Sequence, residues 1–197
     1  EQTVHPLFDN FGERISREEA LEALKLDPQF NYLLFFGFIR DYKGLDILLE
    51  SLADLRLQNL PFKLIVAGEF YSKPDKYLQL IKDLKLENRV ILKTDFIPNN
   101  QVNQYFCASD IVVQPYKSAT QSGVTQIGFH FHKPMLVTNV GGLSEIVLHN
   151  QMGYVVEPVP QEIADSLFDF YENRKESQFS EKVKDEKEKF AWSNMTK

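Results

Sequence analysis

The sequence is poor in cysteine, in basic charge and in long apolar runs. Cys107 is the single cysteine among 197 residues, which excludes an internal disulfide framework and a cysteine-rich metal site. The net charge of −6 argues against a general nucleic-acid surface, which needs a basic excess. No apolar run reaches the ~18–20 residues of a membrane-spanning helix. We therefore expect a cytoplasmic protein with no nucleic-acid partner and at most peripheral contact with a membrane.

Several familiar cofactor motifs are absent as well. The chain has neither a Gly-x-Gly-x-x-Gly fingerprint nor a P-loop, which disfavours a dinucleotide-dependent oxidoreductase and a nucleoside triphosphatase. Short-spaced aspartate pairs of the kind found in metal-dependent transferases are not visible. His130 and His132 lie two positions apart and do not share a helix face, so joint metal binding is not expected. We expect neither a metal nor another bound cofactor.

The apolar residues that are present follow an alternating pattern. They make up 43% of the chain, enough for the core of one ordinary domain. Continuous apolar runs, typical of strands buried on both faces, alternate with segments of helical periodicity. We expect strands at 33–38, 62–68, 90–92, 111–113, 135–138 and 154–156. This order predicts a Rossmann-like, three-layer α/β/α fold with a parallel sheet of about six strands.

Helix signals stand between and beyond the strands. Ser16 and Glu19 match a capping box ahead of an apolar helix face that begins at Ala20. Four leucines between Leu45 and Leu52 have the spacing of one helix face. A long helix is expected around 163–171. The charged stretch that follows, 181–189, is expected to be either a solvated helical face or a frayed tail.

The loop that leaves the fourth predicted strand carries the clearest functional signal. It connects that strand to a helical segment at 124–131, so it lies where ligands bind in an open parallel sheet. Backbone N–H groups at a helix N-terminus suit a phosphate, and a glycine lets a ligand approach closely. The loop is rich in hydroxyl groups, from Ser118, Thr120, Ser122 and Thr125. We expect a phosphorylated ligand to be held by Gln121, Ser122, Gly123, Val124 and Thr125.

Four segments, in order, resemble the motifs of a known enzyme family. They are Phe36 to Asp46 with a Lys-Gly pair, Phe62 to Gly68, Asn88 to Asp110, and Lys133 to Glu145 with two glycines. From residue 32 to 192 the chain is similar to the C-terminal domain of GT-B glycosyltransferases, close to the retaining family 4. The resemblance implies that the chain binds a nucleotide-diphospho-sugar donor. It also implies sugar transfer to a glycan or lipid-linked acceptor, as in polysaccharide biosynthesis.

The resemblance also implies a division of the chain. Residues 1–31 would form an interdomain connection and entry helix, with Val4, His5 and Pro6 similar to the family's entry. Residues 32–197 would form the nucleotide-sugar-binding domain, which ends in a long C-terminal helix. Nothing in the sequence corresponds to the family's N-terminal acceptor domain. That domain is therefore the expected partner, and this segment by itself is expected to be inactive.

Arg40 and Lys43 are the expected catalytic residues. Both follow a buried strand, so both should project from its carboxyl edge. Two cations placed there would stabilise the negative charge that builds on a leaving diphosphate, without a metal. The alternative is two ordinary solvated cations. Gly37, at the end of the same strand, is expected beside the donor.

Three further residues have two readings each. Phe96 and Ile97, after the third strand, could flank the nucleotide base or belong to the core. Glu145 could contact the donor or stabilise its own helix, since a carboxylate near a helix N-terminus is favoured by the helix dipole.

The chain departs from the family pattern at one place. The family has two glutamates spaced Glu-x7-Glu, and Ala119 and Ile127 stand at those positions here. The resemblance implies that the first glutamate lies near the donor sugar and the second near the ribose. A variant subgroup with uncharged polar groups is one reading. A non-catalytic nucleotide-sugar-binding module, or an epimerase or phosphorylase of the same fold, are the others.

Overall fold

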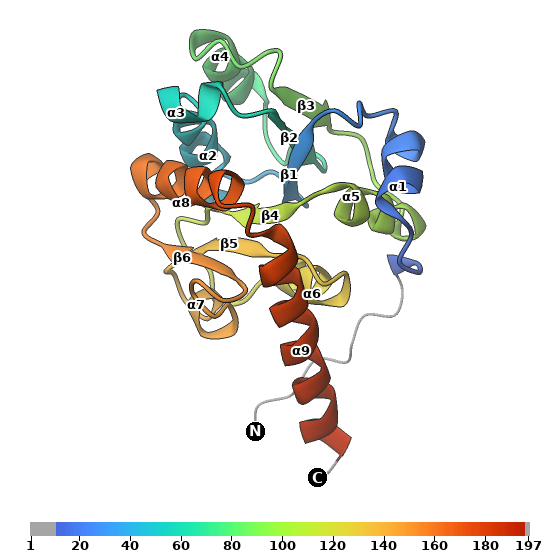
Figure 1. Cartoon of the computed structure of the whole chain (residues 1–197). Coiled ribbons are helices and arrows are strands. Elements are labelled where there is room, and N and C mark those ends of the chain that lie inside the picture. Colours follow the sequence, from blue (N-terminus) through green and yellow to red (C-terminus); the bar gives the residue numbers. More distant parts are fainter. Residues whose placement is uncertain (1–10, 196–197) are drawn as a thin grey trace.

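A computed structural model of the chain describes residues 11–195. Its centre is a sheet of six parallel strands in the order β3-β2-β1-β4-β5-β6 (Figure 1). In chain order the strands are β1 Asn31–Phe36, β2 Phe62–Ala67, β3 Val90–Lys93, β4 Ile111–Gln114, β5 Met135–Thr138 and β6 Gly153–Val156. The Rossmann-like α/β fold predicted from the sequence is confirmed, with each strand close to its predicted position.

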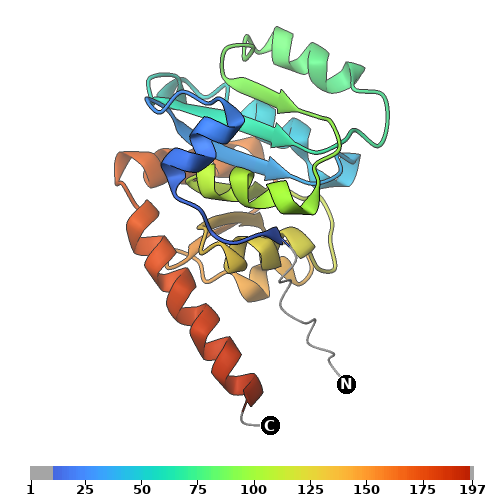
Figure 2. The same ribbon diagram turned by 90° about the vertical axis from the view of Figure 1, so that its right-hand side faces the viewer.

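Helices lie on both faces of the sheet (Figures 1 and 2). In the described part of the chain the α-helices are α1 Arg17–Leu24, α2 Leu45–Ser51, α3 Leu55–Gln58, α4 Asp75–Asp83, α5 Val102–Ala108, α6 Gly123–His130, α7 Leu143–Ile146, α8 Pro160–Glu172 and α9 Glu176–Met195. Two short 3-10 helices, η2 Asp41–Lys43 and η3 Asn99–Gln101, follow β1 and precede α5. The short elements α3 and α7 were not expected, because four residues are too few to give a helical period.

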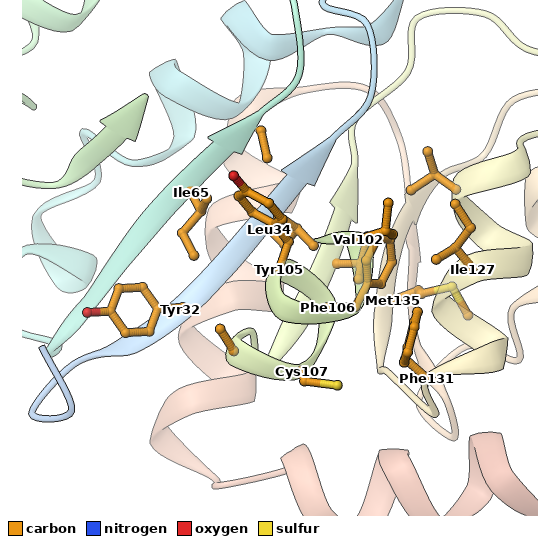
Figure 3. Close-up of a cluster of buried hydrophobic side chains, with 14 of the residues drawn as sticks. Tyr32, Leu34, Ile65, Val102, Tyr105, Phe106, Cys107, Ile127, Phe131 and Met135 are labelled. Carbon is orange, nitrogen blue, oxygen red and sulfur yellow. The ribbon is translucent and has the colours of Figure 1, made fainter. Parts of the chain in front are cut away.

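Two apolar clusters fill the layers on either side of the sheet. Successive side chains of a strand point to opposite faces, so Leu34 and Leu33 fall into different clusters. The first cluster includes side chains of α1, α5 and α6, and Figure 3 shows part of it, including Ile65. The second includes side chains of α2, α3, α4 and α8, together with Leu64. Burial on both faces is the reason the strands are continuous apolar runs.

The entry helix α1 belongs to the same folded unit as the sheet. The predicted capping box is present: the Glu19 backbone N–H donates to Ser16 Oγ at 3.1 Å, and the Ser16 N–H donates to Glu19 Oε2 at 2.8 Å. Ala20, Leu21 and Leu24 are buried in the first cluster, beside side chains of α5. The predicted family-like entry at residues 4–6 lies outside the described residues.

Two helices end the described chain. The helix expected around 163–171 is α8, and the charged stretch from residue 181 lies within α9, so the helical alternative for that stretch is confirmed. The turn between them contains Arg174 with a positive φ of 48°. Phe179 packs in the second cluster and Val183 in the first, so α9 joins the two layers.

Candidate functional site

The topological switch point of the sheet lies between β1 and β4, where open α/β sheets bind ligands. The loop after β1 (residues 37–44) and the loop after β4 (residues 115–122) meet there. The backbone N–H of Lys117 donates to the carbonyl oxygen of Tyr42 at 2.7 Å. Gly44 has a φ of +68°, and a Cβ on it would overlap the carbonyl oxygen of Pro115. The two loops predicted to bind ligand are therefore in direct contact, at a distance that only glycine permits.

Lys43 is a buried cation at the centre of this junction. Its residue is 9% exposed, and among the described residues its ammonium group forms no hydrogen bond or ion pair. A Cβ on Gly37 would lie 3.0 Å from Lys43 Nζ and 3.7 Å from Val124 Cγ2, so the ammonium group, the end of β1 and the first turn of α6 converge. Burial, and then the nearby positive charge of Arg40, lower the pKa of Lys43 to about 8. A buried charge without a counter-ion is costly, so this position favours an anionic ligand.

The N-terminus of α6 borders the same space. Ser122 is the N-cap residue, and its Oγ accepts a hydrogen bond from the Val124 N–H at 3.2 Å. Tyr116 lies between this cap and the buried cation. Its hydroxyl is 3.3 Å from Ser122 Oγ, and its ring centroid is 5.6 Å from Lys43 Nζ. Among the described residues, apart from its chain neighbours and the backbone of α6, no atom lies within 4 Å of the position of a Cβ on Gly123, so α6 faces open space at this residue.

The hydroxyl groups of the loop do not all face that space. Thr125 is fully buried, and its Oγ1 donates to Gln114 Oε1 at 3.0 Å. The hydroxyl of Ser122 caps α6, as described above. Ser118, Thr120 and the side chain of Gln121 are exposed. Within the predicted stretch 121–125, the side chains of Val124 and Thr125 are buried, and the Val124 N–H already donates to Ser122 Oγ.

Arg40 lies at the rim of the site. Its residue is exposed, and its guanidinium carbon stands 4.1 Å from the ring centroid of Tyr71, a residue that follows β2. In the described part of the chain Arg40 has no ion pair with a carboxylate. An aromatic ring supports the guanidinium group without neutralising its charge. The structure therefore brings both predicted cations to the same edge of the sheet, one buried and one exposed.

The loop after β5 supports the loop after β4 from the other side. Gly141 has a φ of +52°, and a Cβ on it would overlap the carbonyl oxygen of Ala119. The Gly142 N–H donates to the carbonyl oxygen of Thr120 at 3.0 Å. The glycine pair of the sequence motif thus permits close packing between two loops. Glu145 follows in α7 with its side chain exposed, and its contact with a donor stays a prediction.

Phe96 and Ile97 lie farther along the sheet edge. They follow β3, which β2 and β1 separate from β4. Phe96 is 71% exposed, while Ile97 is partly buried and packs against the first apolar cluster. The core reading therefore applies to Ile97, and contact of Phe96 with a base stays a prediction. At the positions of the family's two glutamates, Ala119 is partly buried and Ile127 belongs to the first cluster.

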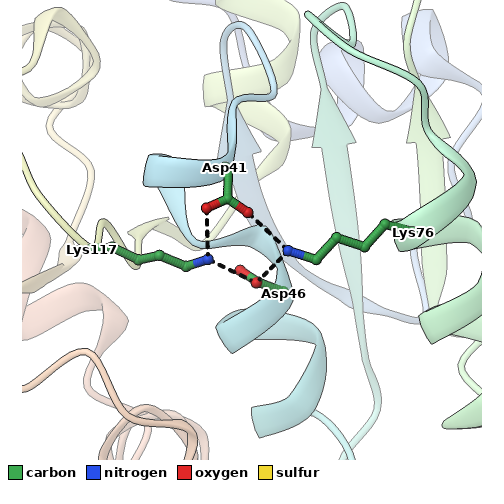
Figure 4. A network of polar contacts seen from close by, with 4 residues as sticks. All are labelled: Asp41, Asp46, Lys76 and Lys117. Atoms are coloured by element: carbon green, nitrogen blue, oxygen red, sulfur yellow. Dashed lines mark hydrogen bonds and ion pairs between the residues drawn. The ribbon is translucent and has the colours of Figure 1, made fainter.

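Sequence reasoning missed two features of this site. One is Tyr116, which joins the buried cation to the cap of α6. The other is a network of four charged residues around the loop after β1, formed by Asp41, Asp46, Lys76 and Lys117 (Figure 4). The only signal for it in the sequence is that Asp41 stands between the two predicted cations. The ion-paired residues of this network are 30 or more positions apart in the chain, and local sequence patterns do not reveal such contacts.

Neither a metal cluster nor a membrane-spanning helix occurs in the described residues. Within residues 11–195, no group of three or more His, Cys, Asp or Glu side chains is arranged to hold a metal ion. In that same part of the chain, no helix combines the length and apolarity needed to cross a bilayer.

Comparison with known sequences points to one family. The family model described as glycosyl transferases group 1 matches residues 16–189. An uncharacterised glycosyltransferase of Methanocaldococcus jannaschii is 27% identical over 173 residues, which are 87% of this chain and 47% of that protein. A D-inositol 3-phosphate glycosyltransferase of Pseudarthrobacter chlorophenolicus is 28% identical over 144 residues, which are 72% of this chain and 34% of that protein. The chain spans about half the length, or less, of these curated relatives.

Solved structures share the fold. The C-terminal domain of a glycosyl transferase group 1 protein, LpcC of Francisella tularensis, has a TM-score of 0.77 and 22% identity. The match covers 89% of this chain and 93% of that domain. HepE of Anabaena, solved in complex with UDP, has a TM-score of 0.75 and 22% identity, with 88% of this chain and 48% of that one covered.

Proposed function

Because the chain belongs to the glycosyl transferases group 1 family, we propose that it is the donor-binding domain of a retaining glycosyltransferase. The observation that carries the proposal is the largely buried side chain of Lys43, whose ammonium group has no carboxylate partner in the described part of the chain, close to Gly123, which faces open space at the N-terminus of α6. A cation without a counter-ion and a helix N-terminus together suit a diphosphate. The solved complex of HepE with UDP supports the same class of ligand.

The proposed chemistry follows from where charge develops. When the bond between the sugar carbon and the donor diphosphate breaks, negative charge builds on the phosphate oxygens. Lys43, Arg40 and the backbone N–H groups at the start of α6 are positioned to stabilise that charge. Because these groups are already positive or polarised, we propose that donor binding needs no metal ion.

The second half of the enzyme would come from a separate domain. The chain corresponds to the length of the isolated LpcC C-terminal domain and to about half of the relatives above. We propose that a further domain holds the acceptor, a glycan or a lipid-linked sugar, against the donor bound here. A non-catalytic nucleotide-sugar-binding module is a second candidate. The absence of both family glutamates, with Ala119 and Ile127 in their places, favours it.

Calorimetric titration with UDP, ADP and GDP tests the proposal. We expect one of them to bind, and Lys43→Ala to weaken that binding by about 1.5–3 kcal/mol, the cost of losing a charge-assisted contact. Lys82→Ala, an exposed lysine of α4, is the matched control and should bind as the wild type does. EDTA should leave the affinity unchanged. Unaltered affinity in the double variant Lys43→Ala with Arg40→Ala would refute the assignment of these two residues to the diphosphate site.

A further inference from the structure

The loop that carries Arg40 and Lys43 also carries a carboxylate that ties it to other elements. Lys117 Nζ lies 2.8 Å from Asp46 Oδ2 and 3.2 Å from Asp41 Oδ2. Lys76 Nζ lies 2.9 Å from the same Asp46 oxygen and 2.8 Å from Asp41 Oδ1 (Figure 4). Each lysine therefore bridges both aspartates.

Asp46 is the least exposed member of this network. Its side chain is 15% exposed, against 70% for Asp41, 54% for Lys76 and 33% for Lys117. Burial by itself would raise the pKa of Asp46, but hydrogen bonds from the two ammonium groups outweigh it and hold that pKa below its ordinary value. Exposed ion pairs contribute little, so the contact between Asp46 and Lys117 is the one with most weight.

That contact ties the start of α2, which follows the loop of Lys43, to the loop after β4. Asp46 lies in the first turn of α2, three residues after Lys43, and Lys117 lies in the loop after β4. The backbone N–H of Lys117 also donates to Tyr42 at 2.7 Å. A side-chain contact and a backbone contact thus fix the loop of the buried cation against the loop that leads to α6.

The network also divides the cations at this edge of the sheet. Lys76 and Lys117 are paired with carboxylates, whereas in the described part of the chain Arg40 and Lys43 are not. Building on the proposed donor site, we propose that Asp46 and Lys117 are positioning residues for the diphosphate. They hold Lys43 and the N-terminus of α6 at the spacing at which both contact one ligand, and they do not contact it themselves.

Asp46→Asn distinguishes positioning from charge. If Asp46 acted only through its negative charge, its removal would strengthen binding of an anionic ligand, because a repulsive charge is lost. If Lys117 contacted the ligand directly, loss of its aspartate partner would likewise strengthen binding. Positioning predicts the opposite sign. We expect affinity for the nucleoside diphosphate that the wild type binds, written here as UDP with uridine as its matching nucleoside, to fall about fivefold, the equivalent of about 1 kcal/mol. Affinity for uridine, measured by NMR titration, should not change, because uridine has no phosphate.

Two further variants make the test robust. Lys117→Met and Lys76→Met remove the same charge from the same pair of aspartates, but Lys76 lies on α4, outside the switch-point loops. We expect UDP affinity to fall in Lys117→Met and to stay near the wild-type value in Lys76→Met, with uridine affinity unaltered in both. The thermal midpoint of unfolding shows whether each variant is folded. If Asp46→Asn does not fold, the comparison of Lys117→Met with Lys76→Met tests the positioning role.

The outcomes separate this inference from the function on which it rests. If the wild type binds UDP and Asp46→Asn binds it equally well or more tightly, the positioning role is overturned and the donor site stands. An equal loss of UDP and uridine affinity would assign the network to general stability. A wild-type chain that binds no nucleoside diphosphate would overturn both proposals.

Discussion

At the scale of single residues, the largely buried Lys43 is the central cation of the site. Its environment is apolar and aromatic, with Tyr116 and Gly37 as neighbours and no carboxylate partner among the described residues. Such an environment penalises the charged form, and an anionic ligand relieves the penalty. Binding of a diphosphate should therefore depend on the protonation of this one group.

We expect UDP affinity to fall with rising pH. The pKa of Lys43 in the free protein is about 8 because of burial and the charge of Arg40, so at pH 9 most molecules carry a neutral amine. Since the ligand selects the charged form, affinity at pH 9 should be about tenfold lower than at pH 7. Titration of Lys43→Met over the same range is the control. A wild-type affinity that does not vary with pH would contradict the assignment.

Asp110, at the opposite edge of the sheet, makes folding pH-dependent. Burial, and then the charge of Glu176, raise its pKa to about 6, although the Tyr32 N–H donates to Asp110 Oδ2 at 2.6 Å. A folded-state pKa above the unfolded value means that stability from this group is present below pH ~4 and lost as pH rises through ~6. Asp110→Asn keeps an acceptor for Tyr32 and does not ionise. Relative to this variant, the wild type should lose about 1–3 kcal/mol of unfolding free energy between pH 4 and pH 7.5. The prediction is refuted if the difference in unfolding free energy between the wild type and Asp110→Asn is the same at both pH values.

At the scale of elements, three loops at the carboxyl edge of the sheet are packed through glycines. The loop after β1 meets the loop after β4 at Gly44, and the loop after β5 meets it at Gly141. Both glycines have positive φ, and both stand where a side chain would overlap a backbone oxygen. These packing glycines differ from Gly123, which has open space around it.

That difference predicts two opposite responses to alanine. Gly123→Ala adds a methyl group to the start of α6 without a clash, so the unfolding free energy should stay the same or rise by up to about 1 kcal/mol. The same methyl group stands where we place the phosphate, so UDP affinity should drop. Gly141→Ala should instead lower the thermal midpoint, because the loop after β4 must shift. Stable Gly123→Ala protein with undiminished UDP affinity would remove the α6 N-terminus from the site.

At the scale of the whole molecule, the chain has the core of an independent domain and one functional edge. Apolar clusters fill both layers, and side chains of α1 and of the early part of α9 (Phe179 and Val183) pack in them. The proposed donor site lies at the carboxyl edge of the sheet. In the proposed enzyme, a second domain brings the acceptor to that edge.

We expect the 197-residue chain to fold alone, to bind a nucleoside diphosphate and to transfer no sugar. Folding follows from its own closed core. Transfer requires an acceptor oxygen held close to the sugar carbon, and that alignment is lost without a second domain. A cooperative unfolding transition tests independent folding, and calorimetric titration with the nucleoside diphosphate tests binding. Product formation from a UDP-sugar, compared with a protein that also has the acceptor domain, tests the third. Equal transfer by both would refute the division of roles.

The sequence by itself determined the order of the strands and the edge at which the proposed site lies. Apolar runs and helical periods are local properties, and in a parallel sheet they locate the carboxyl ends of β1 and β4 without further information. Arg40 and Lys43 could be selected on that basis. The capping box of α1 is also local, and the structure has it as predicted.

Only the tertiary structure decided which polar groups near that edge remain available to bind a ligand. Lys43 and Lys117 are the same residue type in similar loops, but in the described part of the chain Lys43 is buried without a carboxylate partner, whereas Lys117 bridges two aspartates. The Thr125 hydroxyl was expected to donate a hydrogen bond to the ligand, but it donates to Gln114 Oε1 inside the protein. These outcomes depend on distances between residues far apart in the chain. Burial and pairing set the free energy of a charge, and neither is encoded in the residue's own neighbourhood in the sequence.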